Sequence, residues 1–292
     1  MLQSLIGSKV NAPSPLDRIG RDGILRLAFQ RVEGQTVLTE RRFTLPLQAL
    51  EPTPLDKDGS LFLMLLNPTG GLLGGDHLKT EIMLGPGAHV CLTTPSATKV
   101  YRTLGPPAVQ ETVIRLGEGA VLEYLPEHVI PHPGSALHQS LTLEMAMGSR
   151  AIVLDAFAIG RLARGERWLF RELVDRITVT SGSRPLFLER IRLDPSIRIL
   201  GGLGGMESCG YVTTVVLLAD GFGTWESVVR SIEQRLSEAP SVLGGVSQIS
   251  RDGCIIRFLA ASAHDMTRLS RDLWALARQL LLGLPAVELR KW

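Results

Sequence analysis

The stretch GPGAHVCLTT at residues 85–94 has two counterparts farther along the chain, GEGAVLEYLP at 117–126 and GSRAIVLDAF at 148–157. Each begins with a glycine turn and continues as an apolar strand, and the three begin at intervals of 32 and 31 residues. Repeated units of strand, turn and returning strand bury a continuous core when they stack, as in a β-solenoid. The alternative is chance similarity among many glycine turns, since the chain has 30 glycines.

Alternating apolar residues extend the strand prediction on both sides of these repeats. Residues 137–147 alternate apolar and mostly polar side chains, as do shorter segments at 43–47 and 78–84, and LFLMLL at 61–66 has the length of a buried strand. A period of two is typical of a strand with one buried face. We therefore expect strands to dominate residues 24–222.

The C-terminal part has a different period. Apolar residues at 225–236 and 266–280 recur every three or four positions, which predicts two helices, separated by a buried strand at 254–260. Thr224 and Asp265 are candidate N-caps, and Gly283 is a candidate helix end. We expect one domain over residues 1–292, mainly β and α+β overall, with stacked β-helix-like sheets and both helices in residues 223–292.

Composition excludes several functional classes. The net charge is +2 and charged residues make up 21% of the chain, so the basic excess of a nucleic-acid-binding protein is missing. The three cysteines are scattered, which argues against a disulfide framework and a thiolate zinc site. No apolar run is long enough for a membrane span, and the N-terminal residues do not resemble a signal peptide. We expect a cytoplasmic protein that binds neither nucleic acid nor membrane.

Sequence motifs for common enzymes are missing. The glycine-rich segment 70–76, with Gly70, Gly71, Gly74 and Gly75, lacks the GK[ST] ending of a phosphate-binding loop. GxSxG and HExxH also do not occur. Three histidines, His128, His132 and His138, lie close together and could bind a metal ion, but two prolines flank His132 and no helix can align the rings. The alternative is surface histidines in a turn.

Three carboxylates are more informative. Asp155 interrupts the apolar run AIVLDAFAI, Glu189 lies within the strand-like LFLERI, and Asp76 ends the glycine-rich segment. A buried carboxylate is costly unless it is paired or hydrated. Each one could be a structural residue paired with an arginine such as Arg161 or Arg190. If all three face one hydrated interior, they would form a path for a cation.

An arginine-rich stretch begins at Arg161 and continues through Arg164 and Arg167. Arginine is favoured at protein interfaces, so this stretch is a candidate partner surface. Glu166, Glu172 and Asp175 are interleaved with the arginines, which fits a solvated face whose charges pair with each other equally well.

Five segments together resemble the urease accessory protein family called UreD, or UreH in some organisms. They are NPTGGLLGGDHL (67–78), LTTPSATKVYR (92–102), LEYLPEHVIP (122–131), IGRLARGERW (159–168) and LPAVELRKW (284–292). The resemblance covers most of the chain, and the first two segments are specific in combination. It implies a mostly β fold of β-helical character with two helices.

The resemblance also implies a maturation factor that is not itself an enzyme. Such a protein binds apo-urease and the accessory protein UreF, and through UreF the GTPase UreG, and Ni²⁺ passes transiently through an internal tunnel. Asp76, Asp155 and Glu189 are then expected to line that tunnel, because carboxylates with water bind Ni²⁺ weakly enough to release it. Arg290 and Trp292 are candidate contacts for UreF, or Trp292 packs on its own domain.

Two alternatives remain from the residues themselves. One is an enzyme of unknown chemistry that uses the three carboxylates as acid and base. The other is a β-solenoid interaction protein with no role for a metal ion.

Overall fold

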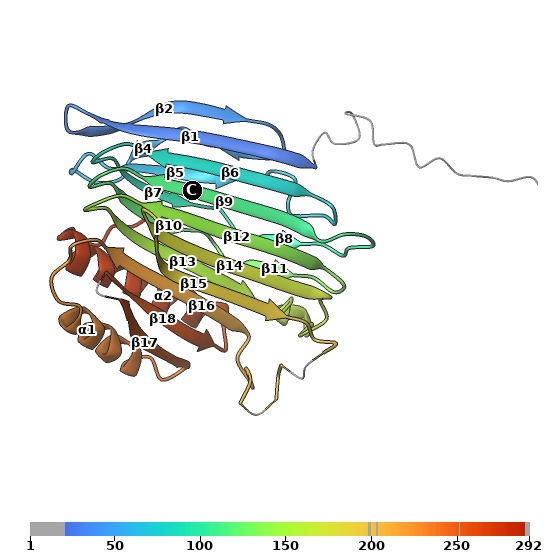
Figure 1. The fold of residues 1–292 in the computed structure, drawn as a ribbon. Coiled ribbons are helices and arrows are strands. Elements are labelled where there is room, and N and C mark those ends of the chain that lie inside the picture. Colours follow the sequence, from blue (N-terminus) through green and yellow to red (C-terminus); the bar gives the residue numbers. More distant parts are fainter. Residues whose placement is uncertain (1–20, 198–199, 203, 251, 290–292) are drawn as a thin grey trace, which may run out of the picture.

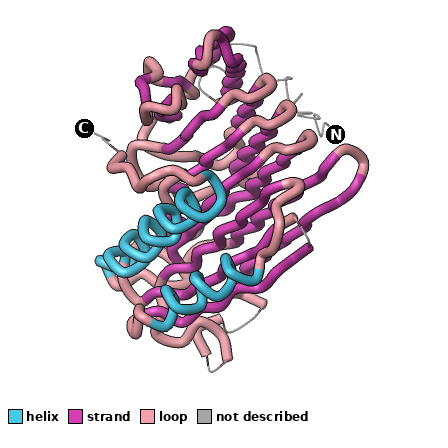
Figure 2. Tube along the Cα trace, turned by 90° about the vertical axis from the view of Figure 1, so that its left-hand side faces the viewer, coloured by secondary structure: helices cyan, strands magenta, loops and turns pink. Residues whose placement is uncertain are grey.

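The computed structural model describes residues 21–197, 200–202, 204–250 and 252–289. Two sheets lie face to face, and both helices cover the outer face of one of them (Figures 1 and 2). Together the strands form a β-solenoid of about four turns. The predicted fold class, mainly β with stacked sheets and two helices in the C-terminal third, is confirmed.

The first sheet has seven strands. In spatial order they are β15 (Arg184–Leu193), β14 (Glu172–Ser181), β12 (Ala136–Met145), β9 (Ala108–Leu116), β6 (His77–Leu84), β1 (Asp22–Val32) and β2 (Gln35–Phe43). The pairs from β14 to β1 are parallel, and the outermost pairs at both edges are antiparallel.

The second sheet has eleven strands. Its main path is β17 (Val242–Ser250), β18 (Gly253–Ala260), β16 (Tyr211–Ala219), β13 (Arg150–Ala158), β10 (Val121–Leu125), β7 (His89–Thr93), β5 (Leu61–Leu66) and β3 (Gln48–Ala49). The short strands β4 (Thr53–Pro54), β8 (Thr98–Val100) and β11 (Val129–Pro131) extend it. The strands β5, β7, β10 and β13 are parallel, while β16, β18 and β17 continue antiparallel.

The chain alternates between the sheets, so each turn of the solenoid contributes one long strand to the first sheet and one to the second, with the short strands β8 and β11 added to the second. The glycine turns between the sheets stack as the repeats predict: the N–H of Gly87 donates to the carbonyl of Glu118, and the N–H of Gly119 donates to that of Met147. Gly87, Gly119 and Gly148 all have φ between +63° and +69°, which a residue with a Cβ adopts only at a cost.

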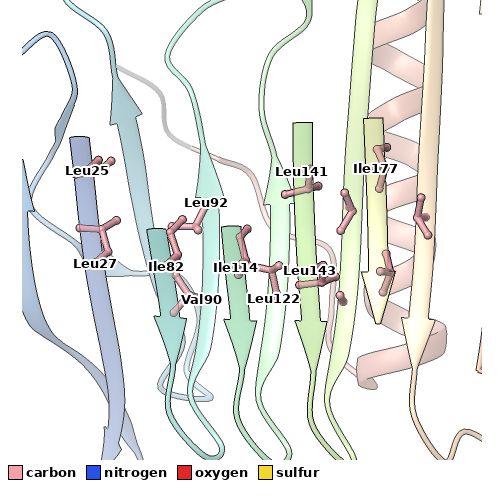
Figure 3. Packing of buried hydrophobic residues seen from close by; sticks show 14 of the residues in the cluster. Leu25, Leu27, Ile82, Val90, Leu92, Ile114, Leu122, Leu141, Leu143 and Ile177 are labelled. Carbon is pink, nitrogen blue, oxygen red and sulfur yellow. The ribbon is translucent and has the colours of Figure 1, made fainter. Parts of the chain in front are cut away.

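Apolar rows fill the interior next to these turns. The strand register aligns Leu27, Ile82, Ile114, Leu143 and Val179 in one such row. Leu92 and Leu122 meet the rows from the second sheet (Figure 3).

The interior becomes polar toward the opposite ends of the same strands. There the register aligns Leu78, Gln110, Gln139 and Asp175 in one row. The solenoid therefore has an apolar half near the glycine turns and a polar half away from them.

The two helices are α1 (Glu226–Ser237) and α2 (Ala263–Ala277), and a π-helical turn, Arg278–Leu282, follows α2. Ser262 caps α2 by accepting a hydrogen bond from the N–H of Asp265, so Asp265 is the third helical residue and not the cap. Thr224 is not the cap of α1, which begins after Trp225. Gly283 ends the second helix in a left-handed conformation, as expected. The alternation at 43–47 does not form a strand, since β2 ends at Phe43.

A second apolar cluster lies between the helices and the outer face of the second sheet, and it includes Trp225, Ile232 and Leu273. Within the described ranges, no helix is long and apolar enough to cross a membrane.

Candidate functional site: an acidic cavity inside the solenoid

A cavity of about 180 Å³ occupies the polar half of the solenoid. Thr80, Gln110, Thr112 and Gln139 line it from the first sheet, and Tyr124 lines it from the second. Half-buried or exposed residues, among them Asn67, Gly70, Ser96, Lys99 and Glu127, line its other end and form a mouth. The volume has room for several water molecules, and the polar wall offers them hydrogen-bonding partners.

Asp155 lies on this cavity, as one of the three predicted carboxylates. Its strand, β13, directs Ala151, Val153 and Phe157 into the core between the sheets, and the period of two directs Asp155 inward as well. The side-chain N–H of Gln139 donates to Asp155 Oδ1 over 3.0 Å. The carboxylate therefore faces the interior with a neutral amide as its hydrogen-bond donor.

Asp175 lies opposite on β14 and also lines the cavity. The interpretation that Asp175 belongs to a solvated charged face is wrong, because its side chain is only 2% exposed. Its Oδ2 atom is buried without a hydrogen-bond partner among the described residues. The sequence does indicate that Asp175 is buried: it alternates in phase with Leu173, Ile177 and Val179, which are all buried.

Both carboxyl groups have raised pKa values, for different reasons. Burial first, and then the negative charge of Asp175, raise the pKa of Asp155 well above its usual value. Burial raises the pKa of Asp175 as well. The phenol of Tyr124 stays neutral, because burial and the charges of the two aspartates raise its pKa to about 12. The cavity thus holds two carboxyl groups that take up protons more readily than usual, and the described chain has no ion-pairing cation beside either of them.

Glu189 lies close to this pair at the edge of the first sheet. Its Oε1 atom accepts from Arg257 Nη2 at 2.5 Å, so its ionic partner is neither Arg190 nor Arg161. Its Oε2 atom is buried and has no hydrogen-bond partner among the described residues. Glu189 does not line the cavity, but its charge raises the pKa of Asp155.

Asp76 lies elsewhere and does not line the cavity. Its carboxylate accepts the backbone N–H of Leu73 over 2.8 Å, which closes the turn that precedes β6. Of the three predicted carboxylates only Asp155 therefore lines the cavity: a local hydrogen bond holds Asp76 in its turn, and Glu189 is paired with Arg257 outside the cavity.

Glycines of the segment 70–76 allow it to pack closely on its neighbours. A Cβ on Gly71 would lie 2.5 Å from the carbonyl oxygen of Lys99, and one on Gly74 would lie 2.6 Å from a methyl group of Thr103. Gly70 and Gly75 have φ of +82° and +83°. These glycines shape a turn at the cavity mouth.

The three histidines are not gathered by the fold. The ring of His128 packs edge-on against Tyr211, that of His132 packs edge-on against Tyr101, and His138 Nε2 lies 3.3 Å from a Glu172 oxygen. In the described part of the chain, no group of three or more His, Cys, Asp or Glu side chains has the arrangement of a metal site. Any cation in the cavity would therefore be held by two carboxylates, neutral oxygens and water.

The predicted partner residues lie at the surface where they are described. Arg161 is paired with Glu166, while Arg167 donates to the carbonyls of Ser208 and Cys209. Arg164 is exposed. Arg290 and Trp292 lie outside the described residues.

A buried charge network beneath α2 was not predicted. Glu123 and Arg278, both fully buried, form an ion pair, and Glu123 also accepts from His89 Nε2 at 2.8 Å and from Trp274 Nε1 at 2.5 Å. Arg278 Nη2 donates to Asp56 over 2.9 Å. The network joins the solenoid to the C-terminal helix across more than 150 residues of sequence, which no local motif reveals.

Comparison with known proteins agrees with the sequence resemblance. A family model described as UreD urease accessory protein matches residues 21–292. A protein of Ralstonia nicotianae named Urease accessory protein UreD is 33% identical over 274 residues, covering 92% of both chains. Proteins of the same name from Cupriavidus necator (32% identical, covering 92% of this chain and 93% of the relative) and an Anaeromyxobacter species (34% identical, covering 86% and 84%) are also similar.

Proposed function

Because this chain belongs to the UreD family of urease accessory proteins and so has a role in urease maturation, we propose that it conducts Ni²⁺ through its internal cavity to apo-urease. In this proposal the chain is a scaffold and not a catalyst. It binds apo-urease and UreF, and UreF brings the GTPase UreG. Nickel is a cargo that enters and leaves the cavity, and none is retained.

One observation supports this proposal above all others: the buried carboxyl groups of Asp155 and Asp175 lie side by side on the wall of a polar cavity inside the solenoid. Two adjacent buried carboxyl groups without a cation cost stability, because they must either repel each other or take up protons, so packing alone does not explain them. A divalent cation with its water would neutralise both charges. Carboxylate, amide and water oxygens suit Ni²⁺ but hold it less firmly than thiolates would.

Release is as important as binding for a conduit. Sites that conduct ions must bind weakly or in series, so that the ion moves on. The described residues around Asp155 offer two carboxylates and no imidazole or thiolate ligand set, which supports passage over storage. Glu189, next to the pair and with one unpartnered oxygen, provides a further step toward the sheet edge where Arg257 lies.

The experiment is a reconstituted activation of apo-urease with UreF, UreG, GTP, bicarbonate and Ni²⁺, with and without this chain. The proposal predicts that urease activity and urease-bound nickel both depend on the chain. Equal nickel incorporation without it would contradict the proposal.

A second function has one specific observation in its favour. A carboxyl group of raised pKa in an enclosed cavity is also what an enzyme with an acid–base mechanism uses, and Asp155 is such a group. Titration of the chain against apo-urease separates the two ideas. A scaffold activates in proportion to its own amount, whereas an enzyme at one-tenth of the urease concentration would reach full activation.

A further inference from the structure

Three leucines are exposed on three of the four neighbouring loops at the end of the solenoid opposite the glycine turns. Leu104 is 90% exposed, Leu73 is 56% exposed and Leu169 is 55% exposed. Exposed leucines that occur singly are normal, but grouped ones mark contact surfaces.

Backbone contacts show that these loops are neighbours. The N–H of Gly75 donates to the carbonyl of Pro107, which joins the loop of Leu73 to the loop of Leu104. The N–H of Thr103 donates to the carbonyl of Gly134, and the N–H of Gly134 donates to that of Leu169. The three leucines therefore lie on one continuous surface, which we call the leucine end.

Basic side chains surround this surface. Arg21 donates to the carbonyl of Gly74, and Arg171 donates to that of Gly105. Arg102 and Arg164 are exposed on the adjacent loops. The charge of Arg21 already acts on the Asp76 carboxylate, whereas Arg102 and Arg171 have no ion pair with a described carboxylate, so their charges are available to a partner.

Two features of the site explain why Leu73 points outward. Gly71 and Gly74 allow the loop to approach Lys99 and Thr103, and the Asp76 carboxylate fixes the backbone N–H of Leu73. Leu72, one residue earlier, is 1% exposed and lines the cavity. The same loop thus forms part of the cavity mouth on its inner side and part of the leucine end on its outer side.

We propose that the leucine end is a docking surface for a partner protein with an acidic contact surface around an apolar spot. The charge complementarity comes from the arginines, and the apolar contact comes from the three leucines. A partner seated there would lie next to the cavity mouth. Asp76 acts in this surface as a positioning residue for Leu73.

The test measures binding of the chain to purified UreF and, separately, to purified apo-urease. Only this choice of probes rests on the proposed function. Leu73→Asp and Leu104→Asp should each weaken binding of one of the two probes at least about tenfold. A combined Arg102→Glu and Arg164→Glu variant should also weaken it and should reduce its dependence on salt.

The matched control is Met147→Asp. Met147 is 71% exposed and lies at the glycine-turn end, so the same change should leave binding as in the wild type. Circular dichroism shows whether each variant is folded. Because Leu104 is almost fully exposed, its substitution should not unfold the chain.

The outcomes separate this proposal from the proposed function. If the leucine variants bind both probes as the wild type does, or if Met147→Asp weakens binding equally, the leucine end is not the docking surface. If the wild type binds neither probe, the proposed function fails and this proposal fails with it. Asp76→Asn adds a further readout, since it should weaken binding without changing the affinity for Ni²⁺.

Discussion

Replacing Glu123 by Gln should destabilise the chain strongly, because it removes the charge that joins the solenoid to α2. Glu123 is fully buried and accepts from His89, Trp274 and Arg278. The amide keeps one acceptor oxygen, but its NH₂ group then faces one of these donors. Arg278 keeps Asp56, and His89 keeps Asp58 at 2.8 Å.

The size of the effect follows from what remains. Removing one member of a buried ion pair costs about 3–5 kcal/mol, since the other charge stays buried. An unfolding entropy of about 2.1 cal/mol/K per residue converts this loss to a fall in Tm of about 5–8 °C. Thermal unfolding followed by circular dichroism at pH 7 measures it.

Glu144→Gln provides the control. Glu144 pairs with Arg115 on the surface, with both side chains nearly half exposed, so its loss should change stability by less than about 0.5 kcal/mol. A Glu123→Gln variant that unfolds within 1 °C of the wild type would show that the buried network contributes little to the attachment of α2.

Three further predictions concern stability. Asp155→Asn should stabilise the chain by about 0.5–2 kcal/mol at pH 7, as expected where function opposes stability. Because folding raises the pKa of Asp155, the gain should appear only above about pH 4, where the carboxyl of the unfolded chain ionises. Burial opposes protonation of His89, but hydrogen bonds to two carboxylates outweigh it and raise the pKa of its ring. The free energy of unfolding should therefore fall as the pH rises from about 6.5 through this raised pKa. His89→Gln should remove that fall in urea titrations. Ser262→Ala should cost about 1 kcal/mol by removing the cap of α2, measurable in the same titrations.

Much of the architecture follows from local patterns. The glycine turns at 85–87, 117–119 and 148 stack as their spacing predicts, since strand length and turn type repeat together. The strand predicted at 43–47 was wrong, because a period of two over only five residues also occurs in extended loops. The assignment of Thr224 as a cap failed because helix ends depend on tertiary packing, here of Trp225 against Phe222.

The site was predictable only in part. Asp155 could be identified because it interrupts an apolar run. Asp175 was missed because its charged neighbours Glu172 and Arg176 suggested a solvated face, although its alternation with buried residues predicts the opposite. Glu123 and Arg278 could not be matched from sequence, because the contact between them depends on how the second helix packs across the sheet.

The most direct measurement for the cation path is the rate of urease activation with an Asp155→Asn and Asp175→Asn double variant in the reconstituted system. A pull-down confirms that the variant still assembles with its partners, and Glu144→Gln runs beside it. The path through the cavity predicts that activation and urease-bound nickel fall at least about tenfold for the double variant alone. Activation at the wild-type rate by an assembled double variant would show that nickel does not pass these two carboxylates.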